Sequence, residues 1–160
     1  EAVDAYARRA AHFGQSMAAM GEVEAALRRQ WSSPLVETWG LLDGEVEARL
    51  RRAETWLDAH PDDAALLTTL GRLSAHLKVW GKAREYLGRA LAAQPRAATW
   101  EALGEVYAGQ DNLLLSQRCY RNALRMGRGD PVEPLPEHAL GAVEASVTDR
   151  RDAHGNPHLP

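Results

Sequence analysis

The stretch that decides the fold is residues 63–95, which read DAALLTTLGRLSAHLKVWGKAREYLGRALAAQP. The spacing of its apolar residues predicts two short amphipathic helices that pack back to back and end at a proline. Small residues let the two helices approach closely, and leucines fill the space beside them. The residues that define this pair are Leu70, Gly71, Ala83, Leu87, Ala90 and Pro95. Because one pair cannot cover its own apolar face, we expect it to stack on similar pairs.

A second copy of the pattern follows directly. Gly104 lies 33 residues after Gly71, and the residues around it recur in nearly the same phase: Trp100, Leu103, Tyr107, Ser116, Tyr120 and Ala123. Together the two copies resemble the tetratricopeptide repeat, whose consensus is W-x2-L-G-x2-Y, then A-x3-F, a second alanine and a closing proline. The second copy has Arg128 in place of that proline, as expected of a last repeat that continues into a tail.

Two more pairs are expected before the central one. Residues 2–30 predict a closely packed pair with its turn at Gly14, because small residues dominate there. Residues 34–59 predict a degenerate, less closely packed pair, capped by one of the serines before it, in which Arg49 and Trp56 stand where alanines are expected. The other expected helices lie at about 64–77, 80–93, 97–109 and 112–126, the last capped by Asp111.

The C-terminal part differs in composition from the rest. Five of the eight prolines follow Met126, so residues 131–160 are expected to form a tail that is partly irregular or disordered, with a short helix near 137–146. The tail either lies across the open end of the stack as a cap or is disordered. The prediction is therefore an all-α, right-handed tetratricopeptide-repeat solenoid over residues 1–130, with about four antiparallel helix pairs at about 2–30, 34–59, 64–95 and 97–127.

Composition agrees with this prediction and excludes several classes of function. The 160 residues are 45% hydrophobic, mostly alanine and leucine, with few β-branched residues. A formal net charge of −3 offers no overall attraction for nucleic acid or anionic lipid. The single cysteine, Cys119, excludes an internal disulfide. No apolar run reaches the ~18 residues needed to span a bilayer, so we expect no direct membrane insertion by this chain.

A narrower resemblance rests on the run Val79-Trp80-Gly81-Lys82-Ala83-Arg84-Glu85-Tyr86-Leu87. The junction His60-Pro61-Asp62-Asp63 and the pairs Gln30-Trp31 and Trp39-Gly40 agree with it. With these motifs, residues 1–126 resemble the C-terminal repeat region of the HemY family, which are inner-membrane, heme-biosynthesis-associated tetratricopeptide proteins of Gram-negative bacteria.

The resemblance implies a protein that serves a late step of protoheme biosynthesis by binding partner proteins, among them heme-pathway enzymes. It also implies N-terminal membrane helices outside this sequence, which begins at Glu1 without a methionine. We therefore expect an inner-membrane-associated soluble domain, on the cytoplasmic rather than the periplasmic side. The flavin-dependent oxidase that shares the HemY name is not resembled, because no G-x-G-x-x-G opens a helix after a strand.

Candidate partner-binding residues follow from the repeat resemblance, in which the first helix of each pair lines a concave groove. The residues at groove positions are Arg8, His12, Arg72, His76, Glu101 and Glu105. An arginine and a histidine four residues apart share one helix face, so such a pair could receive a carboxylate of a peptide or a heme propionate. The ordinary alternative is that all six are solvated residues without a ligand. The Lys/Asn clamp of chaperone-binding repeats is absent.

Metal and heme-iron ligation is a weaker interpretation of the histidines and the cysteine. His12, His60, His76 and Cys119 are candidates, but an iron ligand needs a flat apolar pocket beside it. His154 and His158 in the tail are weaker still, so we predict no metal site and no cofactor. The five tryptophans could contact a porphyrin, although their positions favour core packing. The arginines of residues 49–52 alternate with glutamates, as on an ion-paired solvated helix face.

Enzymatic signatures such as H-E-x-x-H and G-x-S-x-G are absent, so we predict a non-enzymatic protein–protein interaction scaffold. Two alternatives stay open. The chain could be a carrier that binds heme or a porphyrin, or a generic repeat that assists assembly of the cell envelope.

Overall fold

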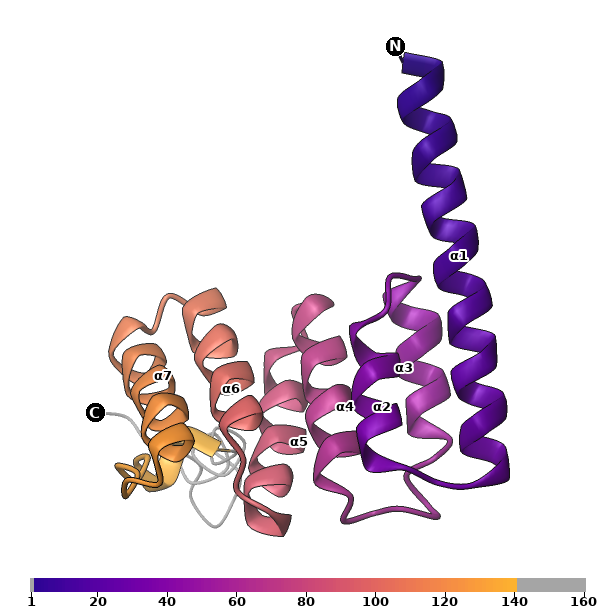
Figure 1. Cartoon of the computed structure of the whole chain (residues 1–160). Helices are drawn as coiled ribbons and strands as arrows, with labels where there is room; N and C mark the ends of the chain where they lie inside the picture. The colour runs from indigo at the N-terminus through magenta and orange to yellow at the C-terminus, as the bar shows by residue number, and fades with distance from the viewer. Residues whose placement is uncertain (1, 141–160) are drawn as a thin grey trace, which may run out of the picture.

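The computed structural model describes residues 2–140, and within that range the side chains of residues 12–136 and 138–140. This part of the chain is all-helical, which confirms the predicted class, and contains no strand (Figure 1). The α-helices are α1 (Ala2–Arg29), α2 (Ser33–Leu41), α3 (Val46–Glu54), α4 (Ala64–His76), α5 (Trp80–Ala93), α6 (Ala97–Gly109) and α7 (Leu113–Arg128). A 3-10 helix, η1 (Glu137–Leu140), follows them.

The helices pack as successive pairs, with α4 in contact with α5 and α6 in contact with α7. Helix α4 lies at the centre of the chain and also contacts α2, α3 and α6. Helices α2, α4 and α6 therefore follow one another along one side of the molecule (Figure 1). Hydrogen bonding and close contact join these three helices. Thr68 of α4 and Thr99 of α6 share a buried hydrogen bond of 2.8 Å, and Gly40 of α2 packs against the side chain of Thr69.

Side chains at the helix starts explain the boundaries. Ser32, Asp63 and Asn112 each accept a hydrogen bond from a backbone amide three residues ahead, which caps α2, α4 and α7. The prediction that Asp111 caps the last helix is wrong by one residue. Asp111 adopts a left-handed conformation with φ of 58°, so it closes the preceding turn and leaves the cap to Asn112. At the other end of α7, Gly129 has φ of 76° and stops the helix.

The helices of the last two pairs approach each other closely at the small residues, as predicted. A Cβ placed on Gly71 would lie 2.5 Å from Leu87, and one on Gly104 would lie 2.7 Å from Tyr120. Ala83 and Ala90 are completely buried between helices. The other repeat-defining residues, Leu70, Leu87, Trp100 and Tyr107, are also buried, whereas Ala123 is half-buried and Pro95 is exposed just after α5. The small residues therefore set the spacing of the helices in both pairs, as expected.

The first predicted pair is wrong, because residues 2–29 form the single helix α1 of 28 residues. Gly14 lies inside α1, and a Cβ added there would meet no atom within 4 Å beyond the adjacent residues and the backbone of the helix itself. One glycine weakens a helix by only about 1 kcal/mol, and the segment holds no proline or Asn-Gly turn to break it. The C-terminal half of α1 packs on α2, while its N-terminal half extends beyond the other helices (Figure 1).

The degenerate second pair is shorter than predicted. Helix α3 ends at Glu54 and residues 55–59 form turns, whereas the sequence pattern predicted one helix over 45–59. Helices α2 and α3 pack mainly on α4 rather than on each other. The bulky Trp56 and Arg49 account for this, because neither permits the close approach that alanine gives in the other pairs.

The segment after α7 folds back on the helices. Residues 130–136 are irregular, and η1 contacts α5, so the described part of the tail lies on the helical body. The rest of the predicted 137–146 helix, and His154 and His158, lie outside the described residues. None of the helices in residues 2–140 combines the length and apolar character needed to cross a bilayer.

Candidate functional site

A small cavity lies between α4 and the end of α2, and two of the predicted groove residues line it. Arg72 and His76, one turn apart on α4, reach a cavity of about 220 Å³. Its other walls come from the end of α2, the loop to α3, α3 itself and α4, namely Gly40, Leu41, Leu42, Asp43, Gly44, Val46, Arg49 and Leu73. Arg72 is half-buried and His76 is exposed, so both remain accessible from solvent.

The rear of this cavity holds Arg49 of α3, which is only 7% exposed. Its Nη2 donates hydrogen bonds to the carbonyl oxygens of Trp39, at 2.9 Å, and Gly40, at 2.6 Å. The last carbonyls of a helix have no partner within the helix, so the guanidinium satisfies the end of α2. It also lies 5.3 Å from the centre of the Trp39 ring. Burial lowers the pKa of Arg49, an effect that nearby Asp43 partly opposes.

The front of the cavity carries an acidic residue paired with a histidine. Asp43 Oδ2 lies 2.9 Å from Nε2 of His12, which extends from α1. Both side chains are 69% exposed, so this contact is an adaptable surface interaction that contributes little stability. The structure therefore brings His12, Arg72 and His76 to the walls or the rim of one cavity. The side chain of Arg8 lies outside the described ones.

The two predicted acidic groove residues lie elsewhere. Glu101 and Glu105 are exposed on α6 and do not line this cavity. They lie near Tyr120 of α7, where burial first, and then the two carboxylates, raise the pKa of the tyrosine. Glu101 and Glu105 therefore lie one helix further along the row than Arg72 and His76, and the partner-binding role of the six predicted groove residues stays a prediction.

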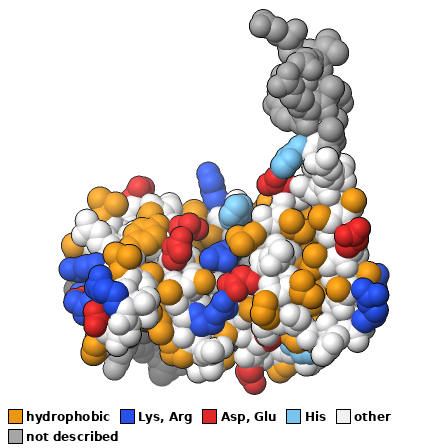
Figure 2. All heavy atoms as spheres, viewed as in Figure 1, with side chains coloured by type: hydrophobic (Ala, Val, Ile, Leu, Met, Phe, Trp, Pro, Cys, Tyr) orange, Lys and Arg blue, Asp and Glu red, His pale blue; other side chains and the backbone are white. Residues whose placement is uncertain are grey.

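An ion pair that no sequence pattern predicted spans the row of helices. Arg96, at the start of α6, donates to Glu37 of α2 at 2.6 Å, across 59 residues of sequence. Figure 2 shows this side of the molecule with basic, acidic and histidine side chains interspersed among hydrophobic ones. The surface visible in this view carries no stripe of one charge.

The remaining histidine and cysteine candidates have structural surroundings. His60 stacks on Trp31 with ring centres 3.7 Å apart. Burial raises the pKa of the Cys119 thiol to about 12, although Arg118 opposes this, so the thiolate form is disfavoured. Within residues 2–140 no three His, Cys, Asp or Glu side chains are grouped to hold a metal ion.

The tryptophans pack against one another and against the core. Trp56 lies edge-on to both Trp31 and Trp39, with ring centres 5.7 Å and 4.8 Å apart. Trp100 is 6% exposed, and Trp80 covers Gly109. These contacts agree with the packing interpretation of the sequence.

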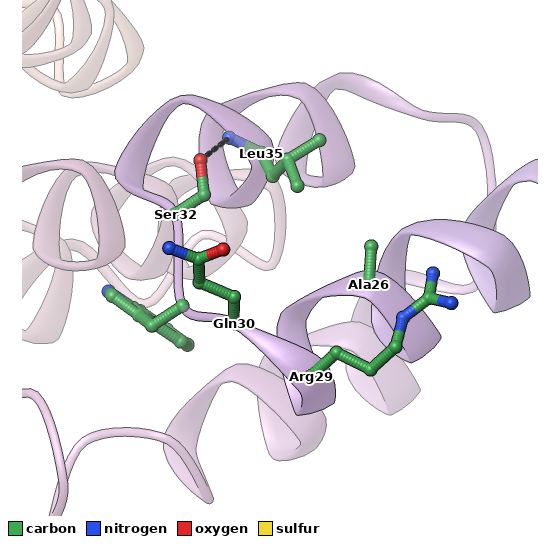
Figure 3. Close-up of a pocket in the computed structure, with 6 residues that line it drawn as sticks. Ala26, Arg29, Gln30, Ser32 and Leu35 are labelled. Carbon is green, nitrogen blue, oxygen red and sulfur yellow. Dashed lines mark hydrogen bonds between the residues drawn. The ribbon is translucent and has the colours of Figure 1, made fainter.

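A larger depression of about 680 Å³ lies at the connection between α1 and α2 (Figure 3). Its lining includes Arg29, Gln30 and Ser32. The Ser32 hydroxyl points toward the backbone amide of Leu35 and caps α2, so this polar group is already used by the fold. The smaller cavity with Arg72 and His76 is consequently the better candidate for binding a charged group. No family model, curated protein or solved structure matches the chain.

Proposed function

We propose that this chain is a non-enzymatic scaffold that binds a protein or peptide partner through the side formed by α2, α4 and α6. On this view the helix pairs form a tetratricopeptide-like right-handed solenoid. The observation that carries the proposal is the cavity in which Arg72 and His76 stand one turn apart, with the buried Arg49 behind them. The partner supplies a carboxylate there, from a glutamate, an aspartate or a chain end.

The chemistry of the cavity supports a carboxylate as the bound group. A guanidinium presents paired N–H donors that match the two oxygens of a carboxylate. Asp43 is the acidic residue of the cavity wall, and its exposed contact with His12 leaves it free to turn away when an anion enters. Arg49 adds positive charge from behind while its own hydrogen bonds stay on α2.

The cellular context of the proposal comes from the resemblance to the HemY family. We place the partner among the enzymes of a late step of protoheme biosynthesis, with this domain associated with the inner membrane. Recovery of such enzymes with the tagged chain from bacterial membranes supports this placement. Recovery of envelope-assembly proteins in their place overturns it and leaves the binding surface unaffected.

A peptide-binding measurement tests the surface itself. The probe is a fluorescently labelled acidic peptide with six glutamates, and binding is followed by anisotropy at low salt. The double variant Arg72→Glu/His76→Glu is expected to bind at least ~10-fold more weakly, because it places two carboxylates in the cavity. The control, Arg28→Glu/Arg51→Glu, removes two exposed arginines outside the cavity. Equal affinities of the two double variants exclude the cavity as the binding site.

A further inference from the structure

Helix α7 holds an extended segment of the chain by its backbone. The Asn122 side chain donates from Nδ2 to the carbonyl oxygen of Glu133 at 2.7 Å, and its Oδ1 accepts from the Glu133 amide at 2.8 Å. Asn122 is completely buried under this contact. A side-chain amide that pairs with both backbone groups of one residue recognises an extended peptide whatever its sequence.

Three arginines of α7 surround the side chain of the same residue. The Glu133 carboxylate lies 3.0 Å from Arg125, 3.7 Å from Arg118 and 3.9 Å from Arg121. These arginines occupy one face of the helix, since they are three, four and seven residues apart. Arg118 and Arg125 also donate to the carbonyl oxygens of Pro134 and Pro131, at 3.3 and 3.4 Å. Helix α7 thus binds an acidic side chain together with the backbone on both sides of it.

The far end of the segment fits an apolar position. Tyr107 donates its hydroxyl to the carbonyl oxygen of Ala139, which is 5% exposed. Leu140 lies beside Gly88, where an added Cβ would be 3.7 Å away. A backbone contact, an acid contact and a small apolar contact therefore follow one another along the surfaces of α7, α6 and α5.

This arrangement has the character of a peptide bound along the helices, and its C-terminal part enters the core, where Ala139 is buried and Leu135 and Leu140 pack beside it. Pro131, Pro134 and Pro136 restrict the segment to extended conformations, and residues 130–136 form no helix or strand. Three guanidiniums face a single carboxylate, so the surface keeps excess positive charge. The arginine side chains are 34 to 59% exposed, and such ion pairs exchange readily because each contributes little free energy.

We propose that α7 carries a binding site for extended, acidic, proline-flanked peptide segments, and that residues 131–136 are its internal ligand. A partner polypeptide with a segment of the same chemistry displaces them. This site is separate from the cavity at Arg72 and His76, since it uses residues of α7. The tether gives the internal ligand an effective concentration on the order of millimolar, so the unmodified chain resists displacement.

The test uses the full chain and a labelled synthetic peptide, PVEPLPEHAL, that copies residues 131–140. The variant Glu133→Arg repels its own segment from the three arginines and frees the site. We expect it to bind the peptide at least ~10-fold more tightly than the unmodified chain does, since the tethered competitor is lost. Glutamine in place of the first glutamate of the peptide, or Asn122→Ala in the protein, should reverse this gain.

Circular dichroism establishes that each variant is folded. If Glu133→Arg does not fold, Glu133→Gln replaces it in the same comparison. A folded variant that does not bind the peptide overturns the proposal. Binding that ignores both Asn122 and the peptide carboxylate overturns it as well, because the peptide then attaches elsewhere.

Discussion

The carboxylate of Asp63 accepts a hydrogen bond from the indole nitrogen of Trp31 at 2.9 Å, across 32 residues of sequence. The same carboxylate accepts hydrogen bonds from the hydroxyl of Ser33 and from the backbone amide of Leu66. The second of these bonds caps the start of α4. One side chain thereby joins the α1–α2 connection to the start of α4. Burial alone would raise the pKa of Asp63, but the hydrogen bonds from Ser33, Trp31 and the amides outweigh it and lower the pKa below the ordinary 3.8.

The first prediction is that Asp63→Asn costs about 2 kcal/mol of unfolding free energy at pH 7, because an amide cannot accept from all three donors. A group with a lowered folded-state pKa stabilises fully above its unfolded pKa, and this contribution is lost as the pH falls through the folded value. The difference between variant and unmodified chain should therefore shrink in strong acid. Urea unfolding at several pH values measures it, with Asp62→Asn as the exposed control. A gap that is independent of pH contradicts the assignment.

The second prediction concerns the contact between Gly71 and Leu87. An alanine at 71 would place its Cβ 2.5 Å from the leucine, so Gly71→Ala should destabilise the protein by about 1–3 kcal/mol despite the better helix propensity of alanine. Leu87→Ala in the same chain should remove part of this penalty, and a double-mutant cycle of unfolding free energies reports the coupling.

A matched control for that cycle is Gly81→Ala on α5, where no neighbouring atom lies within 4 Å of the added Cβ. This substitution should be neutral or stabilise the helix by up to about 1 kcal/mol. Equal effects at positions 71 and 81 would show that the close approach of α4 and α5 does not restrict residue size.

The third prediction concerns Arg49. Its replacement by alanine leaves the carbonyls of Trp39 and Gly40 without their donor, so we expect a loss of about 3 kcal/mol. Lysine keeps the charge but offers no forked donor, and Arg49→Lys should lose less. Thermal unfolding of both variants distinguishes the hydrogen bonds from the charge. An unchanged melting temperature of the alanine variant would mean that water satisfies the end of α2.

The fourth prediction distinguishes one long helix from a helix pair at the N-terminus. Because Gly14 lies inside α1 with free space around it, Gly14→Ala should increase helical content and stabilise α1 by up to about 1 kcal/mol. If Gly14 formed a turn, the same change would reduce both quantities. Far-UV circular dichroism with thermal melting gives the sign of the effect.

Local sequence signals predicted α4 to α7 well. Helices α5 and α6 have the predicted bounds. Pro95 stands between them and Gly109 ends α6, although neither helix has a side-chain cap at its start. The N-terminal region was mispredicted for a related reason. Small residues at helical spacing fit a pair and a long helix equally, and Gly14 is too weak a signal to choose between them.

The candidate site could be predicted only in part. Spacing on one helix placed Arg72 and His76 together, because residues four apart share a face. The alternating charges around Arg49 predicted a solvated face, whereas its repeat position, at which a close-packed alanine is expected, was the signal that agrees with its burial. Contacts between distant segments, such as Glu37 with Arg96 or Asn122 with Glu133, depend on the packing of whole helices. The partner-binding role of the six groove residues stays a prediction.

The guanidinium cluster around Glu133 forms a contact whose dependence on ionic strength is opposite to that of the contacts between helices. Helix-to-helix joints depend on apolar burial, which salting-out anions such as sulfate reinforce. The attachment of the C-terminal segment to α7 depends in part on the ion pairs of Glu133, which dissolved ions screen over roughly 10 Å at 0.1 M. Concentrated sulfate should therefore weaken the binding of that segment to α7 while it stabilises the packing of the helices. The two kinds of contact can thus be distinguished by their opposite dependence on salt.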